Sequence, residues 1–299
     1  MIIFIHNGWH DYLRAALLQA RHSNPDQNIF LITDQCTNKI NKFASEFNIN
    51  LVPIDKYHCS ASLFSLKYHH SGANPYKYEL FCFQRWFILN EFLADVGGSG
   101  PGLLLDSDAF LYVDINKQLG VQKTQLTVCN KCGPQFSFFK SPEIIEKYCD
   151  YIFDVFTDPL VYKKCQNYIT ENPNLGVPHV SDMVTLGTFA GDGNLEDTYN
   201  PNRPLIFDEN IANVNGYKSA FFGKKLFKID KSHYFETNNH TLKLVGGIHL
   251  QGASKRLWPL FVDKSVIFKV INIKSLAYFI FETANRFMRF NIKNLTNKR

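Results

Sequence analysis

Two carboxylates, Asp106 and Asp108, are the residues best placed to carry chemistry. Only Ser107 separates them, and they directly follow the apolar run Leu103–Leu105. Carboxylates beside a buried strand cost free energy unless a cation or hydrogen bonds compensate them. Oxygen ligands suit Mg²⁺ or Mn²⁺, which share their remaining positions with phosphate oxygens. The D-x-D spacing therefore predicts a divalent cation on Asp106 and Asp108, with Ser107 beside the bound phosphates.

A second group of polar residues follows another apolar stretch near the end of the chain. His249, Gly252 and Lys255 are spaced His-x-x-Gly-x-x-Lys after the apolar-rich segment 241–248. Imidazole is a ligand for Mn²⁺, and lysine is a compact counter-charge for phosphate. A lone histidine is more often a hydrogen-bonded core residue. The D-x-D motif upstream nevertheless makes His249 a candidate for a site rather than for the core.

The elements that must position these residues alternate between strands and helices. Strands are predicted at Ile2–Ile5, Asn28–Thr33 and Asn50–Ile54, and helices at Tyr12–Ala20 and Ile40–Phe47. This β-α-β-α-β rhythm indicates an α/β fold with a parallel sheet and right-handed crossovers. Ligands of open α/β sheets bind where the strands end, so a site is expected at that edge.

The strongest helical pattern, Tyr78–Ala94, ends at the glycine-rich segment 97–102, just before the D-x-D strand. Residues 56–76 lack periodicity and are expected to be irregular, with room for a short helix, and residues 166–204 are expected to be loop. The remaining predicted elements are a helix at Pro142–Phe156 and strands at Gln125–Cys129, Gln135–Phe139, Leu226–Ile229 and Thr241–Ile248.

The upstream D-x-D together with His-x-x-Gly-x-x-Lys resembles glycosyltransferase family 8 and related A-type (GT-A) glycosyltransferases. The resemblance implies a Rossmann-like nucleotide-diphospho-sugar transferase fold with a mostly parallel central sheet and a C-terminal helical tail. It also implies that Asp106, Asp108 and His249 hold Mn²⁺ or Mg²⁺, and that Gly252 and Lys255 attend the diphosphate. The implied reaction moves a hexose from a nucleoside diphosphate sugar, by expectation a UDP-sugar, to a glycan or glycolipid hydroxyl, with retention favoured.

Four further residues are candidates for binding the nucleotide. His6 and Asn7 end the first predicted strand, Asp34 ends the second, and Arg85 lies in the helix before the D-x-D strand. Similar enzymes contact the nucleotide at the end of the first strand and carry a basic residue near the donor. Ordinary turn chemistry explains the strand-end residues equally well, and a surface arginine whose stem covers apolar neighbours explains Arg85.

Asp182 and Gln135 are the candidate catalytic residues. Asp182 lies in a segment that resembles the family's second acidic motif, and Gln135, with Ser137, falls where a sugar-facing strand is expected. An inverting enzyme needs a base for the acceptor hydroxyl, and Asp182 is the best candidate. Asp208 and Glu209 are held in reserve, and a solvated loop residue is an equally good explanation for each.

Charge divides the chain into a body and a tail. Residues 262–299 carry eight basic and two acidic residues, which leaves 24 basic and 25 acidic residues in the body. A nucleic-acid enzyme would spread its positive charge over a binding face of the body. We therefore expect a GT-A domain at 1–261 and a basic amphipathic tail at 262–299 that contacts an anionic membrane surface, and no nucleic-acid partner.

The seven cysteines form no recognisable disulfide framework, which favours a reducing compartment. The N-terminus predicts no signal peptide, and no stretch reaches the length of a spanning helix. The expected location is therefore cytoplasmic, at most peripheral to the inner face of a membrane. Three alternatives stay open: a phosphatase that also uses D-x-D, a sugar nucleotidyltransferase, and a non-catalytic glycan- or nucleotide-binding protein on the same fold.

Overall fold

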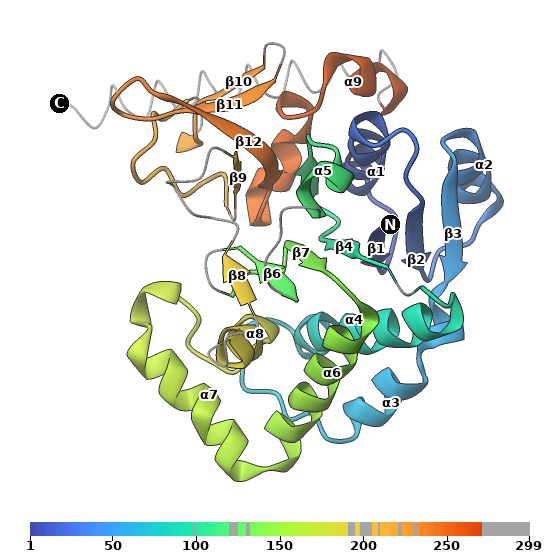
Figure 1. Ribbon diagram of the computed structural model, residues 1–299, viewed down its shortest axis with the longest axis vertical. Helices are drawn as coiled ribbons and strands as arrows, with labels where there is room; N and C mark the ends of the chain where they lie inside the picture. Colours follow the sequence, from blue (N-terminus) through green and yellow to red (C-terminus); the bar gives the residue numbers. More distant parts are fainter. Residues whose placement is uncertain are drawn as a thin grey trace.

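A computed structural model describes residues 1–98, 100–119, 125–129, 132–190, 195–197, 205–208, 210–220, 223–229 and 232–270 (Figure 1). Its N-terminal part, up to Leu105, is a parallel α/β unit, as expected. The strands are β1 (Ile2–His6), β2 (Ile29–Thr33), β3 (Ile49–Pro53) and β4 (Gly102–Leu105), and the connecting helices are α1 (Asp11–Ser23) and α2 (Asn38–Glu46). β1 pairs in parallel with both β2 and β4, and β2 pairs in parallel with β3. The carboxyl ends of these strands therefore meet at one edge of the sheet.

Three later strands extend this sheet beyond β4. They are β7 (Phe136–Phe139), β6 (Leu126–Val128) and β8 (Leu195–Asp197), and the strand order is β3-β2-β1-β4-β7-β6-β8. β7 runs antiparallel to β4 and β6, and β8 runs parallel to β6. The predicted fold class is confirmed: the protein is α/β, with a mostly parallel central sheet.

The central sheet is buried on both faces. In β1, Ile2 and Phe4 belong to one apolar core with α1, whereas Ile3 and Ile5 belong to a second core with α4 (Tyr76–Asp95). α6 (Pro142–Thr157) packs beside α4 on that second side (Figure 1). Because successive side chains of a strand point to opposite faces, a nearly continuous apolar run is what a sheet covered on both sides requires.

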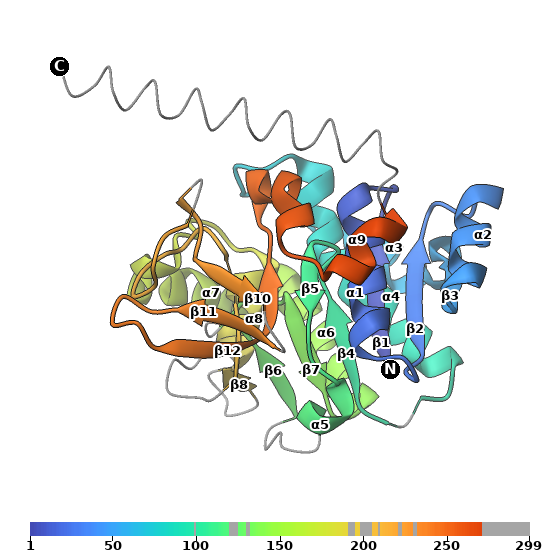
Figure 2. The ribbon, with the colours of Figure 1, turned by 90° about the horizontal axis from the view of Figure 1, so that it is seen from above.

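A second sheet lies next to the first (Figure 2). Its order is β10 (Phe227–Ile229), β11 (His233–Glu236), β12 (Leu242–His249) and β5 (Ala109–Leu111), and β9 (Leu205–Phe207) pairs with β12. The D-x-D turn joins β4 of the first sheet to β5 of the second. β12 runs antiparallel to β5, with His249 opposite Ala109. The last strand is thereby brought directly to the D-x-D turn.

The expectation of loop at residues 166–204 is wrong for part of that segment. α7 (Pro159–Glu171) extends into it, η2 (Pro173–Leu175) follows, and α8 (Asp182–Ala190) and β8 lie wholly within it. α8 contains glycine and β-branched residues, which are poor helix formers, but Val184 and Leu186 are buried. Packing against α6 and α7 therefore overrides the weak local preference.

The segment expected to be irregular, residues 56–76, contains the end of η1 (Ile54–Tyr57) and α3 (Cys59–Ser65). α3 packs on α4 through Phe64, which stacks on Phe87 with ring centroids 4.9 Å apart. A short helix is marginal alone and depends on such contacts. α5 (Ile115–Leu119) is another short helix, and it follows β5.

The structure describes the predicted tail only as far as Val270. η4 (Gly252–Leu260) leads into α9 (Lys264–Val270), which packs on α1 and buries Val266 and Val270. Residues 271–299, which make up most of the predicted tail, lie outside the described residues. Within the described part of the chain, no helix is both long enough and apolar enough to span a bilayer.

Candidate metal and nucleotide site

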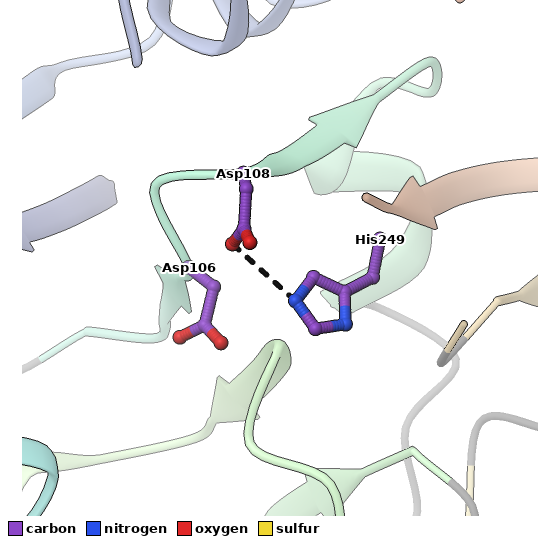
Figure 3. A group of neighbouring side chains, drawn as sticks. All are labelled: Asp106, Asp108 and His249. Atoms are coloured by element: carbon purple, nitrogen blue, oxygen red, sulfur yellow. Dashed lines mark ion pairs between the residues drawn. The ribbon is translucent and has the colours of Figure 1, made fainter. Parts of the chain in front are cut away.

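Asp106, Asp108 and His249 come together at the edge where the two sheets meet. One ligand atom from each lies within 4.8 Å of the other two. Figure 3 shows the three side chains directed towards a common space, the aspartates from the β4–β5 turn and the histidine from the end of β12. Asp108 and His249 are each only 5% exposed. Two carboxylates and an imidazole form a donor set that suits Mn²⁺ or Mg²⁺.

Backbone hydrogen bonds fix the turn that carries both aspartates. The N–H of Asp106 donates to the carbonyl of Gln135 (3.2 Å), which ties the turn to β7. The N–H of Leu250 donates to the carbonyl of Asp108 (3.0 Å), which ties it to the end of β12. The site is therefore held by regular elements on both sides, and its geometry does not depend on a loose loop.

Lys255 reaches into the site from η4. Its Nζ lies 3.0 Å from Oδ2 of Asp108, and Nε2 of His249 lies 3.3 Å from Oδ1. Burial alone would raise the pKa of Asp108, but His249 and Lys255 outweigh burial and hold that pKa well below its usual range. Gly252 begins η4 with a φ of +58°, a left-handed conformation that favours glycine.

Arg85 links the D-x-D turn to the second candidate acidic position. From α4, its guanidinium forms ion pairs with Asp106 and, at 2.8 Å, with Oδ2 of Asp182. Asp182 is the first residue of α8, and its carbonyl accepts a hydrogen bond from the Tyr148 hydroxyl (3.0 Å). Burial, opposed by Arg85, raises the pKa of Asp182. The positive charge of Arg85 thus offsets the negative charges of Asp106 and Asp182, which would otherwise repel each other.

A cleft of 640 Å³ opens over these residues. Of the residues singled out in the sequence, the following line it: His6, Asn7, Arg85, Asp106, Ser107, Asp108, Gln135, Asp182, His249, Gly252 and Lys255. Asp34 is not among the lining residues. Its Oδ1 accepts a hydrogen bond from the N–H of Gly8 (2.7 Å), so its side chain holds the loop that follows β1. The structure places these residues, and their roles in binding stay predictions.

Gln135 lines the cleft with a buried side chain. Its Oε1 has no hydrogen-bond partner among the described residues. Ser137, by contrast, donates from its hydroxyl to the carbonyl of Pro134 (2.9 Å) and does not line the cleft. Asp208 forms a fully buried ion pair with Lys225 and is not among the residues that line the cleft. Glu209 lies outside the described residues.

Several cleft residues were not singled out in the sequence. His10 and Tyr12 stack with ring centroids 5.0 Å apart, and Nζ of Lys255 lies 5.1 Å from the Tyr12 centroid. Further lining residues are Asn74, Lys77, Tyr78, Phe81 and Met183. His10 and Tyr12 follow the end of β1, so the strand-end rule that pointed to His6 could have pointed to them. No strand end or motif in the sequence pointed to Asn74, Lys77, Tyr78 and Phe81, which lie before and within α4.

His6 is held without a proton at neutral pH. Burial, with smaller contributions from His10 and Lys255, lowers its pKa from 6.5 to about 4. Its ring meets the rings of His10 and Tyr12 edge-on, with centroids 5.3 and 6.1 Å apart. A neutral imidazole at the base of a cleft can hydrogen-bond a ligand without repelling a neighbouring metal ion.

This lowered pKa predicts a pH-dependent stability. As the pH falls from about 6.5 towards 4, the unfolded chain protonates His6 before the folded protein does, so stability is lost. Between pH 7 and pH 5 the loss from this group should be about 2 kcal/mol. Urea unfolding in EDTA should show a smaller pH dependence for His6→Phe than for wild type. His58 is partly buried and does not line the cleft, so His58→Phe is the control, and equal slopes in all three proteins would contradict the prediction.

Comparison with known proteins gives only distant similarities. No family model and no curated protein sequence matches the chain. Among solved structures, the galactosyltransferase LgtC in complex with donor and acceptor sugar analogs has 12% identity and a TM-score of 0.47, with 95% of each chain covered. The apo structure of the bifunctional enzyme WbbM has 12% identity and a TM-score of 0.49, with 91% of this chain and 49% of that chain covered. Apo mouse xyloside xylosyltransferase 1 has 8% identity and a TM-score of 0.40, with coverage of 66% and 83%. These are glycosyltransferases.

Proposed function

We propose that the protein is a metal-dependent glycosyltransferase of the GT-A type. It transfers a hexose from a nucleoside diphosphate sugar, a UDP-sugar in the first instance, to a hydroxyl of a glycan or glycolipid. The observation that carries the proposal is the convergence of Asp106, Asp108 and His249 from distant segments into one cleft, with Lys255 beside them.

The chain's own residues divide the work of binding the donor. A divalent ion on Asp106, Asp108 and His249 supplies Lewis-acid stabilisation of the leaving diphosphate. Lys255 adds a point charge for phosphate oxygens, and Gly252 brings the start of η4 to the rim of the cleft without a side chain. Arg85 orients Asp106 through their ion pair. His6 and Asn7, at the end of β1, are then placed to contact the nucleoside.

Asp182 and Gln135 are the candidates for contact with the reacting sugar. Gln135 lines the cleft, and its side-chain oxygen has no hydrogen-bond partner among the described residues. Asp182 also lines the cleft, with a buried carboxylate held by Arg85. A retaining transfer needs polar groups that orient and stabilise the sugar, and we favour this course. Asp182 would serve as the base only in an inverting transfer.

The test is a calorimetric titration of UDP into the protein, first with Mn²⁺ and then with EDTA. We expect tight binding with the metal and at least about a tenfold loss without it, because an ion held by Asp106, Asp108 and His249 would compensate the charge of the diphosphate. A panel of UDP-sugars then identifies the donor by hydrolysis. Absence of metal-dependent binding for both UDP and GDP would overturn the proposal. Metal-dependent binding with no turnover of any donor would favour the non-catalytic binding protein.

We also propose that the predicted tail, residues 262–299, holds the cytoplasmic enzyme at an anionic membrane. Eight of its residues are basic and two acidic, and in the described part Phe268 is 73% exposed on α9. Basic residues near an anionic bilayer contribute about 1 kcal/mol each. Sedimentation with vesicles of phosphatidylglycerol, compared with neutral phosphatidylcholine vesicles, tests this, and equal partitioning would refute it.

A further inference from the structure

Both carboxylate oxygens of Asp108 are already engaged by protein side chains. His249 lies against one oxygen at 3.3 Å, and the ammonium of Lys255 lies 3.0 Å from the other. The carboxylate is 7% exposed, so solvent contributes little to its compensation. A metal ion that binds Asp108 must therefore take a place beside a cation that is already there.

Among the described residues, Lys255 and Arg85 are the two cations that form ion pairs with the aspartates of the cleft, and they are held very differently. Arg85 is 11% exposed, pairs with two carboxylates and also donates from Nε to the carbonyl of Cys82 (3.2 Å). Lys255 is 32% exposed and pairs with Asp108 alone among the described residues. Its four-carbon stem rotates freely compared with a guanidinium fixed at both ends. Lys255 is therefore the cation that can leave.

Electrostatic repulsion by an incoming cation favours the departure of Lys255 from Asp108. Two cations on one carboxylate that is only 7% exposed repel each other, and a divalent ion doubles that repulsion. The diphosphate of a nucleotide supplies a new partner, because Lys255 lines the same cleft as Asp106 and Asp108. An ammonium moving from a carboxylate to a phosphate keeps its charge compensated throughout.

We infer that Lys255 is a resident counter-ion for Asp108, which the metal displaces and the diphosphate receives. This inference rests on the proposed function and adds regulation to that site. When the metal binds alone, the Lys255–Asp108 ion pair must break without replacement. When a nucleoside diphosphate is also present, the ammonium of Lys255 pairs with the diphosphate instead. The two ligands therefore bind cooperatively. By linkage, each raises the affinity of the other by the same factor.

The experiment measures Mn²⁺ binding directly, through the paramagnetic resonance signal of the free ion, with and without UDP. Coupling energies between sites typically correspond to factors of about 5 to 150, and we expect wild type to gain at least about tenfold in Mn²⁺ affinity when UDP is present. Lys255→Met should bind Mn²⁺ alone more tightly than wild type. It should also lose most of the enhancement by UDP.

Arg256→Met is the matched control, since it removes an equal charge from the next residue of η4, which is exposed and does not line the cleft. It should behave as wild type. Lys255→Gln serves as a second variant if Lys255→Met does not fold, and near-ultraviolet dichroism reports folding for each.

Two results would overturn the inference while leaving the metal site intact. One is a wild-type Mn²⁺ affinity that UDP does not change. The other is a Lys255→Met or Lys255→Gln protein that binds Mn²⁺ alone no more tightly than wild type, as a residue that only contacts phosphate would give. If Mn²⁺ binds wild type neither alone nor with UDP, the proposed function fails together with the inference.

Discussion

Asp108→Asn should lower the rate of metal-dependent sugar transfer by at least about a thousandfold, equivalent to about 4 kcal/mol of lost transition-state stabilisation. Asparagine keeps the shape of the side chain but removes the charge that, in the proposed function, holds the ion. Asp108 is the member of the cluster that contacts both His249 and Lys255, so no neighbouring carboxylate can replace it.

Two measurements check this expectation. Transfer from the preferred donor gives the rate, and calorimetry of UDP with Mn²⁺ shows whether binding or only turnover is lost. Asp95→Asn is the control, because Asp95 is an exposed carboxylate at the far end of α4 that pairs with Lys56. It should retain wild-type transfer. An Asp108→Asn protein with near-normal rates and metal-dependent UDP binding would show that the D-x-D is not the metal site.

Arg85→Met should destabilise the metal-free protein by about 3 to 5 kcal/mol. Methionine fills similar space but leaves Asp106 and Asp182 without their shared cation. Breaking a buried ion pair from one side is costly because the remaining charge stays buried and uncompensated. The larger share of this destabilisation should come from Asp182, because its side chain is only 7% exposed.

Urea unfolding in EDTA measures the cost, and a second substitution tests the cause. Arg85→Met with Asp182→Asn should recover part of the loss, because the buried charge is then gone. Arg14→Met is the control, since Arg14 pairs with an exposed carboxylate, Asp11, and should cost less than about 1 kcal/mol. If the double variant is as unstable as the sum of the single ones, uncompensated charge is not the reason.

The parallel half of the fold could be predicted because its pattern is local. The apolar runs of β1 to β4 each end in polar or turn residues, and the predicted boundaries agree with the observed ones to within about two residues. The helix predicted at Tyr78–Ala94 is α4, Tyr76–Asp95. In these segments, strand length, burial and the adjoining turn chemistry all favour one structure.

The missed elements depend on tertiary contacts that a local pattern does not contain. α8 is apolar nearly throughout, so it shows no helical stripe; its burial between α6 and α7 decides its conformation. β5 was missed because it is only Ala109–Leu111, directly after the D-x-D turn. Its identity as a strand depends on pairing with β12.

Part of the candidate site could likewise be predicted from the sequence, and part could not. Residue type and spacing pointed to Asp106, Asp108 and His249 as a group, and the structure brings them together. The ion pairs that Arg85 and Lys255 make with the aspartates were not predictable, because they depend on side chains from separate helices meeting across the cleft. Periodicity within each helix carries no information about such a meeting.

The pairing of β12 with β5 also sets the order in which the molecule can acquire its activity. A chain leaves the ribosome from its N-terminus, and its domains fold largely as it emerges. β1 to β4 can assemble early, but β5 cannot pair until β12, which ends at His249, has been synthesised. A nascent chain therefore holds two of the three proposed metal ligands without the third. We expect each newly made molecule to stay unable to use a nucleotide sugar until translation has passed that strand.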